Sequence, residues 1–508
     1  MAGRRGSCEG SGAVGSQGAP GHGRPVRGQP GGSQPAEAGT ASRVCGTWCI
    51  ITRPACSARL REPLVANAGP EIYLPLVLMP HRALLLSLVL FSSTASAQYE
   101  VGRASSGQHL SISFTLPTGV AGPVKLAPRG AAWGLKPQVS NVHCGDHPVP
   151  QDQEGYWVAP AGCPRITWRV VPDVIPAEGA DASEQRTLAV GQARWILLAE
   201  PTSLLRPLNS DGATTIRSAP GHAPMVGATQ TEPGVSRVPP VNSGPEFYVV
   251  GAARPSKRTL GELQIIYFAD NARRVQQLDL EALHASALRH LTQVVPLPRT
   301  SPAMDRSLLV VWLGVSESRG GAGGAAGSRS FLANYVLGSS ANKGRNTALT
   351  MTIVAHEQFH QLVDVLRSDL PNQALAVWLN ESIAHYYALK ALLVADKSRS
   401  AKEVWARFID PDRSVEHGLV ELNRRYGAGD QAVYNLFYSQ GATFWYAIDS
   451  ALKAATDGKK SLDDYLLELL RGPLAHGSDL PPSFIEQIRQ VGGPPIDQIL
   501  SRYGTQAR

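Results

Sequence analysis

The stretch Thr350-Met-Thr-Ile-Val-Ala-His356-Glu357-Gln-Phe-His360-Gln-Leu-Val-Asp364 decides how the rest of this chain is interpreted. It contains no proline or glycine, and its apolar residues recur at helical spacing, so we expect a helix. His356 and His360 are four residues apart, which places both imidazoles on one face, one turn apart. Both can then reach one Zn²⁺, and Glu357 beside them can act as a general base towards water. The stretch therefore predicts a zinc site.

A second segment offers a third ligand for the same ion. Ala376-Val-Trp-Leu-Asn380-Glu381-Ser-Ile-Ala-His385-Tyr-Tyr387 is typical of another apolar helix, with Glu381 in its first turns. Two histidines and one carboxylate leave the fourth tetrahedral position to water, as a hydrolytic zinc site requires. The alternative is an amphipathic helix whose Glu381 is exposed to solvent. The aromatic surroundings favour a buried ligand, since unpaired carboxylates are rare in such places.

Three polar residues lie close to these ligands in the sequence. His385 is one turn beyond Glu381 and is either an alternative ligand, a group that orients a ligand, or a hydrogen-bonded core histidine. Asp364, one turn beyond His360, is expected to orient or cap rather than to bind metal. Asn380, next to Glu381, is expected to support the site in the same way.

Outside the two helices the chain changes character. Residues 98–200 alternate polar and apolar side chains in short runs, such as His109–Leu116 and Ile166–Val171, which predicts antiparallel strands in a β-sandwich domain. Residues 201–245 are rich in Pro, Gly, Ser and Thr and predict a linker or a long loop. The glycine run at 320–327 lacks the Lys-Ser/Thr ending of a nucleotide-binding loop and predicts a mobile loop.

The remaining pattern indicates an α+β catalytic domain at 246–395 and a helical domain at 396–508. Strands and a helix precede Thr347, and almost everything after it has helical periodicity. We expect strands at 246–251, 263–268 and 307–313, and a helix at 279–294.

The first 97 residues predict no folded domain. Residues 1–78 are glycine-rich and contain no Lys or Asp, so they bury too little apolar surface to fold. Residues 79–97 combine Met-Pro-His-Arg82, an apolar run and Ala-Ser-Ala97, the pattern of a secretory signal peptide. A transmembrane helix is the alternative, but the run is too short to span a bilayer. We expect Met79 to be the true start, 1–78 to be upstream sequence translated from a misplaced start, and the protein to be periplasmic or secreted.

Cysteine usage agrees with export. After residue 97 the chain keeps only Cys144 and Cys163, an even number, which predicts one disulfide in an oxidising compartment. Two buried free thiols are the alternative.

The charge of the chain does not indicate a nucleic-acid partner. Its formal net charge is +7, from 48 basic and 41 acidic residues, but nine arginines and only four glutamates precede Gln98. The rest of the chain is nearly neutral, and its basic residues are dispersed. We expect no nucleic-acid binding, and no transmembrane helix after signal cleavage.

The two helical segments resemble the gluzincin zinc metallopeptidases, whose aminopeptidases have a similar Trp-Leu-Asn-Glu segment. Leu436-Phe-Tyr438-Ser-Gln-Gly441-Ala-Thr-Phe-Trp-Tyr-Ala-Ile-Asp449 and Ser461-Leu-Asp-Asp464 are similar to elements of the glycyl aminopeptidase family. The resemblance covers roughly 246–505 and implies a thermolysin-like catalytic domain at 246–395. It also implies that Tyr438 donates its phenol to the oxyanion of the reaction. On its own, Tyr438 would be interpreted as a core tyrosine.

The resemblance implies an exported zinc metallopeptidase acting on a peptide or protein substrate. Aminopeptidases of this kind hold the substrate's α-amine with a carboxylate before the zinc-binding helix, but residues 327–335 contain none. Amino-terminal and internal cleavage therefore both remain open. The alternative function is a catalytically silent relative that binds peptide or protein in the same cleft.

Overall fold

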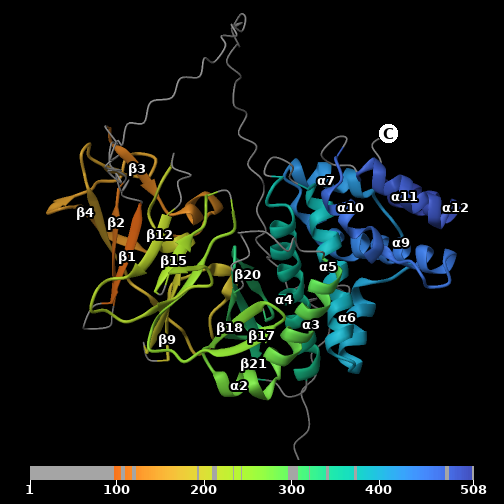
Figure 1. The fold of residues 1–508 in the computed structure, drawn as a ribbon, viewed down its shortest axis with the longest axis horizontal. Coiled ribbons are helices and arrows are strands. Elements are labelled where there is room, and N and C mark those ends of the chain that lie inside the picture. The colour runs from red at the N-terminus through yellow and green to blue at the C-terminus, as the bar shows by residue number, and fades with distance from the viewer. Residues whose placement is uncertain are drawn as a thin grey trace, which may run out of the picture. The chain divides into compact units, whose positions relative to one another are not determined.

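The structure is a computed structural model, drawn in Figure 1, and the described part of the chain begins at Ala97. The predictions for residues 1–78 and for 79–96 of the signal peptide therefore lie outside the described residues. The described ranges are 97–103, 109–116, 122–191, 194–208, 214–232, 234–241, 243–295, 307–319, 321–338, 342–370, 375–474 and 480–505.

An eight-stranded sheet forms the first layer, in the order β14-β15-β12-β1-β2-β7-β4-β5. Strand β1 pairs in parallel with β12 and antiparallel with β2, and the other pairs in this sheet are antiparallel. Its strands are β1 (Gln98–Arg103), β2 (Leu110–Thr115), β4 (Val139–Cys144), β5 (His147–Pro148), β7 (Arg165–Val170), β12 (Thr214–Ser218), β14 (Gln230–Glu232) and β15 (Val235–Val238).

A five-stranded sheet forms the second layer, in the order β13-β16-β10-β9-β8. Ile196 and Tyr248 share one buried core with the first sheet, and their neighbours Leu197 and Phe247 belong to a second core on the opposite face. The two central strands are therefore buried on both faces, which explains why they are continuously apolar. The strands are β8 (Asp173–Val174), β9 (Leu188–Val190), β10 (Trp195–Ala199), β13 (Met225–Val226) and β16 (Phe247–Gly251).

Short elements complete this amino-terminal part. A three-stranded sheet has the order β11-β3-β6, and a disulfide joins Cys144, at the end of β4, to Cys163. The elements are β3 (Val124–Ala127), β6 (Trp157–Ala159), β11 (Arg206–Pro207), α1 (Glu200–Ser203) and the 3₁₀ turns η1 (Arg129–Trp133) and η2 (Ala182–Glu184).

A second five-stranded sheet, in the order β17-β18-β19-β21-β20, supports the helices. Strands β18, β19 and β21 are parallel, and the two edge strands pair antiparallel. Alternate residues of β19 point to opposite faces: Leu309 and Val311 pack towards the preceding sheet, while Trp312 packs in the helical core. The strands are β17 (Ser256–Leu260), β18 (Leu263–Ala269), β19 (Ser307–Ser316), β20 (Gly324–Ala326) and β21 (Ser330–Leu337).

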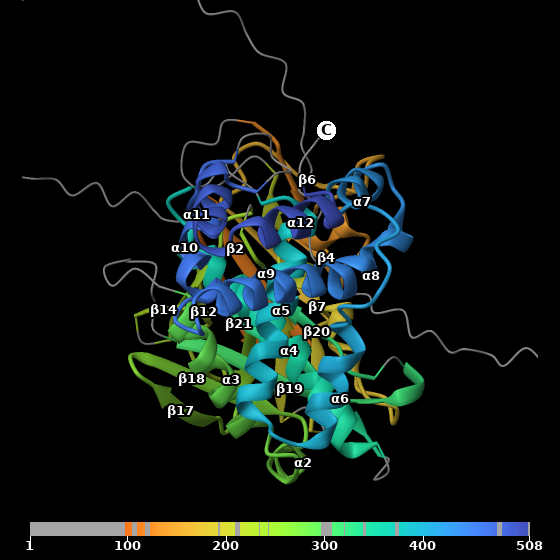
Figure 2. The same cartoon turned by 90° about the vertical axis from the view of Figure 1, so that its right-hand side faces the viewer.

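Helices α3, α4 and α5 pack against each other, and α4 lies against β21 (Figure 2). They and the later helices share a single buried core with the sheet. The helices are α2 (Ala272–Gln277), α3 (Leu280–Val294), α4 (Lys343–Leu366), α5 (Val377–Ala395), α6 (Arg399–Phe408), α7 (Leu419–Gly427), α8 (Tyr434–Leu436), α9 (Ala442–Ala455), α10 (Leu466–Arg471), α11 (Pro482–Gly492) and α12 (Pro494–Tyr503), with the short turns η3 (Glu317–Arg319), η4 (Gln431–Val433) and η6 (Leu462–Tyr465) and a π-helical segment η5 (Phe437–Gly441).

Three segments differ from the sequence-based expectations. Residues 201–245, predicted as a linker or long loop, contain β11 to β15, because Ile216 and Val238 supply the buried residues of very short strands while Pro and Gly serve their turns. Strand β16, assigned to the catalytic domain, lies in the second sheet. The glycine run, predicted as a mobile loop, contains the edge strand β20, which pairs with β21. Glycine at 324 allows this close packing, because a Cβ there would come within 2.7 Å of the Phe331 ring.

Among the described residues, no helix combines the length and apolar composition that a bilayer span needs.

A buried ion cluster joins η1, α1 and β11 in the amino-terminal part. Glu200 is fully buried, and its Oε1 lies 2.9 Å from Arg129 Nε and 3.0 Å from Arg206 Nη1. Glu200→Gln should therefore lower the free energy of unfolding by about 3–5 kcal/mol, because two buried guanidinium groups lose their counter-charge. Chemical denaturation followed by circular dichroism measures the effect.

The matched control is Glu421→Gln, which removes an ion pair with Arg424 in which both side chains are solvent-exposed. Solvent screens such a pair, so its loss should leave the denaturation midpoint nearly unchanged. Equal midpoints for the two variants would show that the Glu200 cluster contributes no specific stability.

Candidate metal centre

Helix α4 carries His356, Glu357 and His360 in its central turns, inside the protein. The helix has a buried residue at nearly every position from Ala348 to Leu366, so it is a core helix rather than a surface one. Helix α5 packs along it and brings Glu381 to the same place. The two helices therefore join residues 25 positions apart in the sequence.

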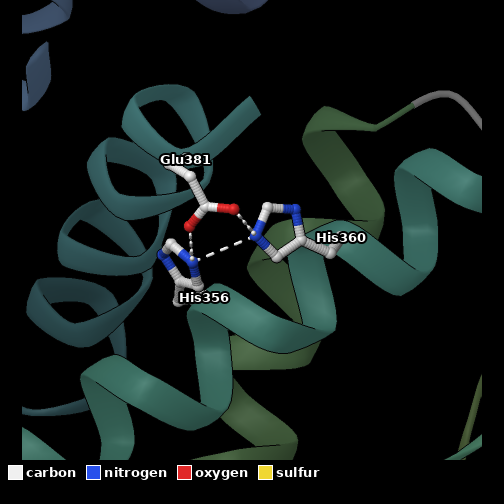
Figure 3. A group of neighbouring side chains, drawn as sticks. All are labelled: His356, His360 and Glu381. Atoms are coloured by element: carbon white, nitrogen blue, oxygen red, sulfur yellow. Dashed lines mark hydrogen bonds and ion pairs between the residues drawn. The ribbon is translucent and has the colours of Figure 1, made fainter. Parts of the chain in front are cut away.

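The donor atoms of three residues converge on one point (Figure 3). His356 Nε2 lies 3.2 Å from Glu381 Oε2 and 3.0 Å from His360 Nε2, and the second oxygen of Glu381 lies 3.6 Å from His360 Nε2. All three side chains are buried, and their donor atoms lie within 4.8 Å of one another. Two imidazoles and a carboxylate form a donor set suited to Zn²⁺, so these residues fit the predicted ion.

The charges of these side chains depend on one another. Burial acts to raise the pKa of Glu381, but attraction to His360 and hydrogen bonds from both histidines outweigh it and hold the pKa well below its usual value. Burial acts to lower the pKa of His360, but Glu381 outweighs it and raises the pKa to about 9. A metal ion must therefore displace a proton from His360 to bind, since only a neutral imidazole is a ligand.

Glu357 lies next to the ligand His356 in the sequence and is buried as the ligands are. It is 2% exposed, and its Oε1 has no hydrogen-bond partner among the described residues. Burial raises its pKa to about 7. A carboxylate with these properties can gain and lose a proton near neutral pH, which is what a general base does.

Tyr438 reaches the centre from a segment 57 residues beyond Glu381. Its hydroxyl donates to Glu381 Oε2 at 3.1 Å, and its ring centroid lies 5.4 Å from that of His356. It belongs to the π-helical segment η5, a distortion often found at functional sites. Gly441 allows the segment to approach α5, because a Cβ there would lie 2.4 Å from Ser382 Cβ. Burial keeps the pKa of Tyr438 well above its usual value, so the phenol remains a hydrogen-bond donor.

The other predicted residues lie near the centre but outside the group of three. His385 is buried, with its ring 5.6 Å from that of His356 and 5.0 Å from that of Tyr438. Its Nε2 has no hydrogen-bond partner among the described residues. Asp364 is exposed, and its charge helps to raise the pKa of His360. Asn380 is half-buried in the first turn of α5.

Sequence reasoning missed two buried glutamines on α4. Gln361 Nε2 donates to the carbonyl oxygens of Gly327 at 2.7 Å and Ser330 at 2.9 Å, while Gln358 Nε2 donates to Gln361 Oε1 at 2.7 Å. The available signal was two amide side chains on one face of a helix that is otherwise apolar, since buried polar groups require partners.

Comparisons with known proteins agree with this arrangement at the level of the fold. No protein-family model and no curated protein matches the chain. A solved structure of an aminopeptidase N family protein from Idiomarina loihiensis matches with a TM-score of 0.55 and 14% identity, over 81% of this chain and 76% of that one. The two chains share a fold. The mixed α+β architecture with a carboxy-terminal helical region is therefore like that of an aminopeptidase N family protein.

His360→Ala should abolish tight zinc binding, because two remaining ligands hold the ion poorly. The affinity should fall by at least about 100-fold, measured by calorimetric titration of the apoprotein with zinc chloride. For the parent protein, affinity should also fall as the pH is lowered below about 9, because protons then compete for His360.

His222→Ala is the control, since His222 is exposed in the amino-terminal layers and belongs to no metal group. Zinc affinity in His360→Ala equal to that of this control would rule out the proposed ligand set.

Proposed function

We propose that this protein is a zinc-dependent metallopeptidase that adds water across peptide bonds. The observation that supports the proposal is that the donor atoms of His356, His360 and Glu381 converge. The buried carboxyl group of Glu357 and the buried phenol of Tyr438 accompany them. A purely structural zinc site closes its coordination with protein ligands and needs neither a base nor an additional donor. The shared fold with an aminopeptidase N family protein gives further support.

Each residue has a distinct role in this proposal. His356, His360 and Glu381 hold the zinc, which when bound supplies Lewis-acid polarisation of the scissile carbonyl and of water. Glu357 accepts the proton of the attacking water and passes it to the leaving amine. Tyr438 gives its hydrogen bond to the oxygen that becomes negative, so its present bond to Glu381 must be exchanged when substrate binds. His385, Asn380 and Asp364 support the ligands.

An edge strand, β20, packs against the metal-binding helix α4 and is a candidate binding site for the backbone of a peptide substrate. Strand β20 is at the end of its sheet, and among the described strands β21 is its one partner. An extended peptide can add to such an edge through main-chain hydrogen bonds, which are independent of side-chain identity.

The proposal includes a class of binding partner and a cellular location. We propose a peptide or protein substrate and no nucleic-acid partner. The disulfide between Cys144 and Cys163 supports export to the periplasm or the exterior, where such bonds persist.

A catalytically silent binding protein is less well supported. Burying Glu357 costs free energy, since one of its oxygens has no partner among the described residues. Binding alone gives no reason to keep that carboxyl group, whereas water activation does.

Glu357→Gln should lower kcat by about 10²–10⁴-fold, because the substituted amide cannot accept a proton. Zinc content and the circular dichroism spectrum should match those of the parent, since Glu357 is not a ligand. The substrate is first found by digesting a peptide library and identifying the products by mass spectrometry. Unchanged turnover in zinc-loaded Glu357→Gln would exclude Glu357 as the base.

Tyr438→Phe should lower kcat by about 10²–10³-fold and leave KM nearly unchanged, because the bond to the oxyanion forms only in the transition state. The same assay measures both constants. If Tyr438→Phe cleaves every substrate as fast as the parent, the assignment is wrong, and Tyr434, whose ring centroid lies 5.3 Å from that of Tyr438, becomes the candidate.

A further inference from the structure

The turn that joins β20 to β21, residues 327–330, is tied directly to the metal-binding helix. Gln361 follows the ligand His360, and its Nε2 donates to the carbonyl oxygens of Gly327 and Ser330. Gln361 is 4% exposed and Ser330 is fully buried, so water does not compete for these bonds. Buried amide-to-carbonyl bonds of this kind are costly to lose. Without Gln361 the carbonyl oxygen of Gly327 loses this donor, while that of Ser330 keeps one other, Gly327 N at 2.7 Å.

Gln358 fixes the orientation of this amide. Its Nε2 donates to Gln361 Oε1 at 2.7 Å, which uses the acceptor of Gln361 and leaves the two donor hydrogens for the turn. The pair therefore acts as a clamp between α4 and the turn.

The opposite side of the turn is attached to the amino-terminal layers. Phe247 N donates to Ser330 Oγ at 2.8 Å, and Ser328 N donates to the carbonyl oxygen of Pro245 at 2.6 Å. Arg329 N donates to Glu246 Oε2 at 3.2 Å. A Cβ on Gly327 would lie 2.4 Å from the oxygen of Pro245, so the backbone is packed closely here. Gln361 thus connects a turn fixed to the second sheet with the helix that carries the ligands.

We propose that Gln361 is a positioning residue that sets the place of edge strand β20 relative to His356 and His360. Strand β20 ends at Ala326, immediately before the clamped turn. The proposal rests on the proposed function, in which a peptide lies along β20 and presents its scissile bond to the centre. Loss of the clamp removes the tie between the turn and α4, so the strand can shift relative to the ligands and a substrate that docks on it binds less tightly.

The test replaces Gln361 by Met, which has a similar volume and no donor. KM for a library-derived peptide that spans several residues should rise about tenfold, while kcat stays within about twofold of the parent. A tenfold rise corresponds to the free energy that about one buried hydrogen bond contributes. A single-residue chromogenic amide, which contacts little of the strand, should show a smaller rise. Zinc content should stay equal to that of the parent.

A second readout does not depend on activity. Amide hydrogen exchange in residues 324–331 should become faster in Gln361→Met, while exchange in residues 353–362 of α4 stays as in the parent. Gln358→Met should change both readouts in the same direction but less, because Gln361 keeps its donors and loses only its orientation.

The matched control is Gln138→Met. Gln138 also makes side-chain bonds to backbone, with Nε2 donating to the oxygen of Thr187 and Oε1 accepting from its nitrogen, but it lies in the amino-terminal layers. It should lower stability without changing KM or the exchange of residues 324–331.

Unchanged exchange in residues 324–331 of Gln361→Met would overturn the clamp. Faster exchange with an unchanged KM, or a fall in kcat alone, would overturn the role in substrate docking. A parent that cleaves no peptide would instead contradict the proposed function, and the exchange measurement would still decide whether Gln361 holds the strand.

Discussion

The structure depends on the burial of one carboxylate between two histidines. Glu381 is 1% exposed and is held by His356 and His360, and without such partners its charge could not remain inside the protein. The pairing fixes the register of α5 against α4, because a shift of either helix would separate Glu381 from both histidines. The same three groups form the donor set for a metal ion. The interaction that specifies the helix packing is therefore also the one that prepares the site.

The packing of the sheets and helices in layers holds α4 in a fixed position relative to the rest of the chain. The mixed sheet of β17 to β21 supports α4 on one face and contacts the second sheet with the other, so two separate cores hold it in place. Gln361 and the turn at 327–330 connect these layers through hydrogen bonds, while the π-helical segment brings Tyr438 over the ligands. The site is thus assembled from an edge strand, two core helices and one distorted helix, each fixed by buried contacts rather than by its own sequence.

Local patterns predicted the elements that carry the strongest signals. The helical spacing of His356 and His360 and the apolar periodicity of both core helices are properties of nearby residues, so they could be recognised without a structure. The prediction of a linker at 201–245 failed because strands of two to five residues show little periodicity, and the partners that make them strands lie far away in the chain, as β1 does for β12. The boundary before β16 was misplaced for the same reason: a continuous apolar strand does not reveal which sheet it joins.

The sequence by itself determined the chemical types at the centre: two imidazoles one turn apart, a carboxylate beside them and a second apolar helix with a further carboxylate. Tertiary structure alone decided that Glu381 meets both histidines, that Tyr438 donates to it and that Gln361 holds the turn after β20. The physical reason is the separation along the sequence over which each effect acts. Periodicity and helix geometry act over a few residues, whereas these contacts join positions 21 to 57 residues apart, and only the packing of several layers fixes such distances.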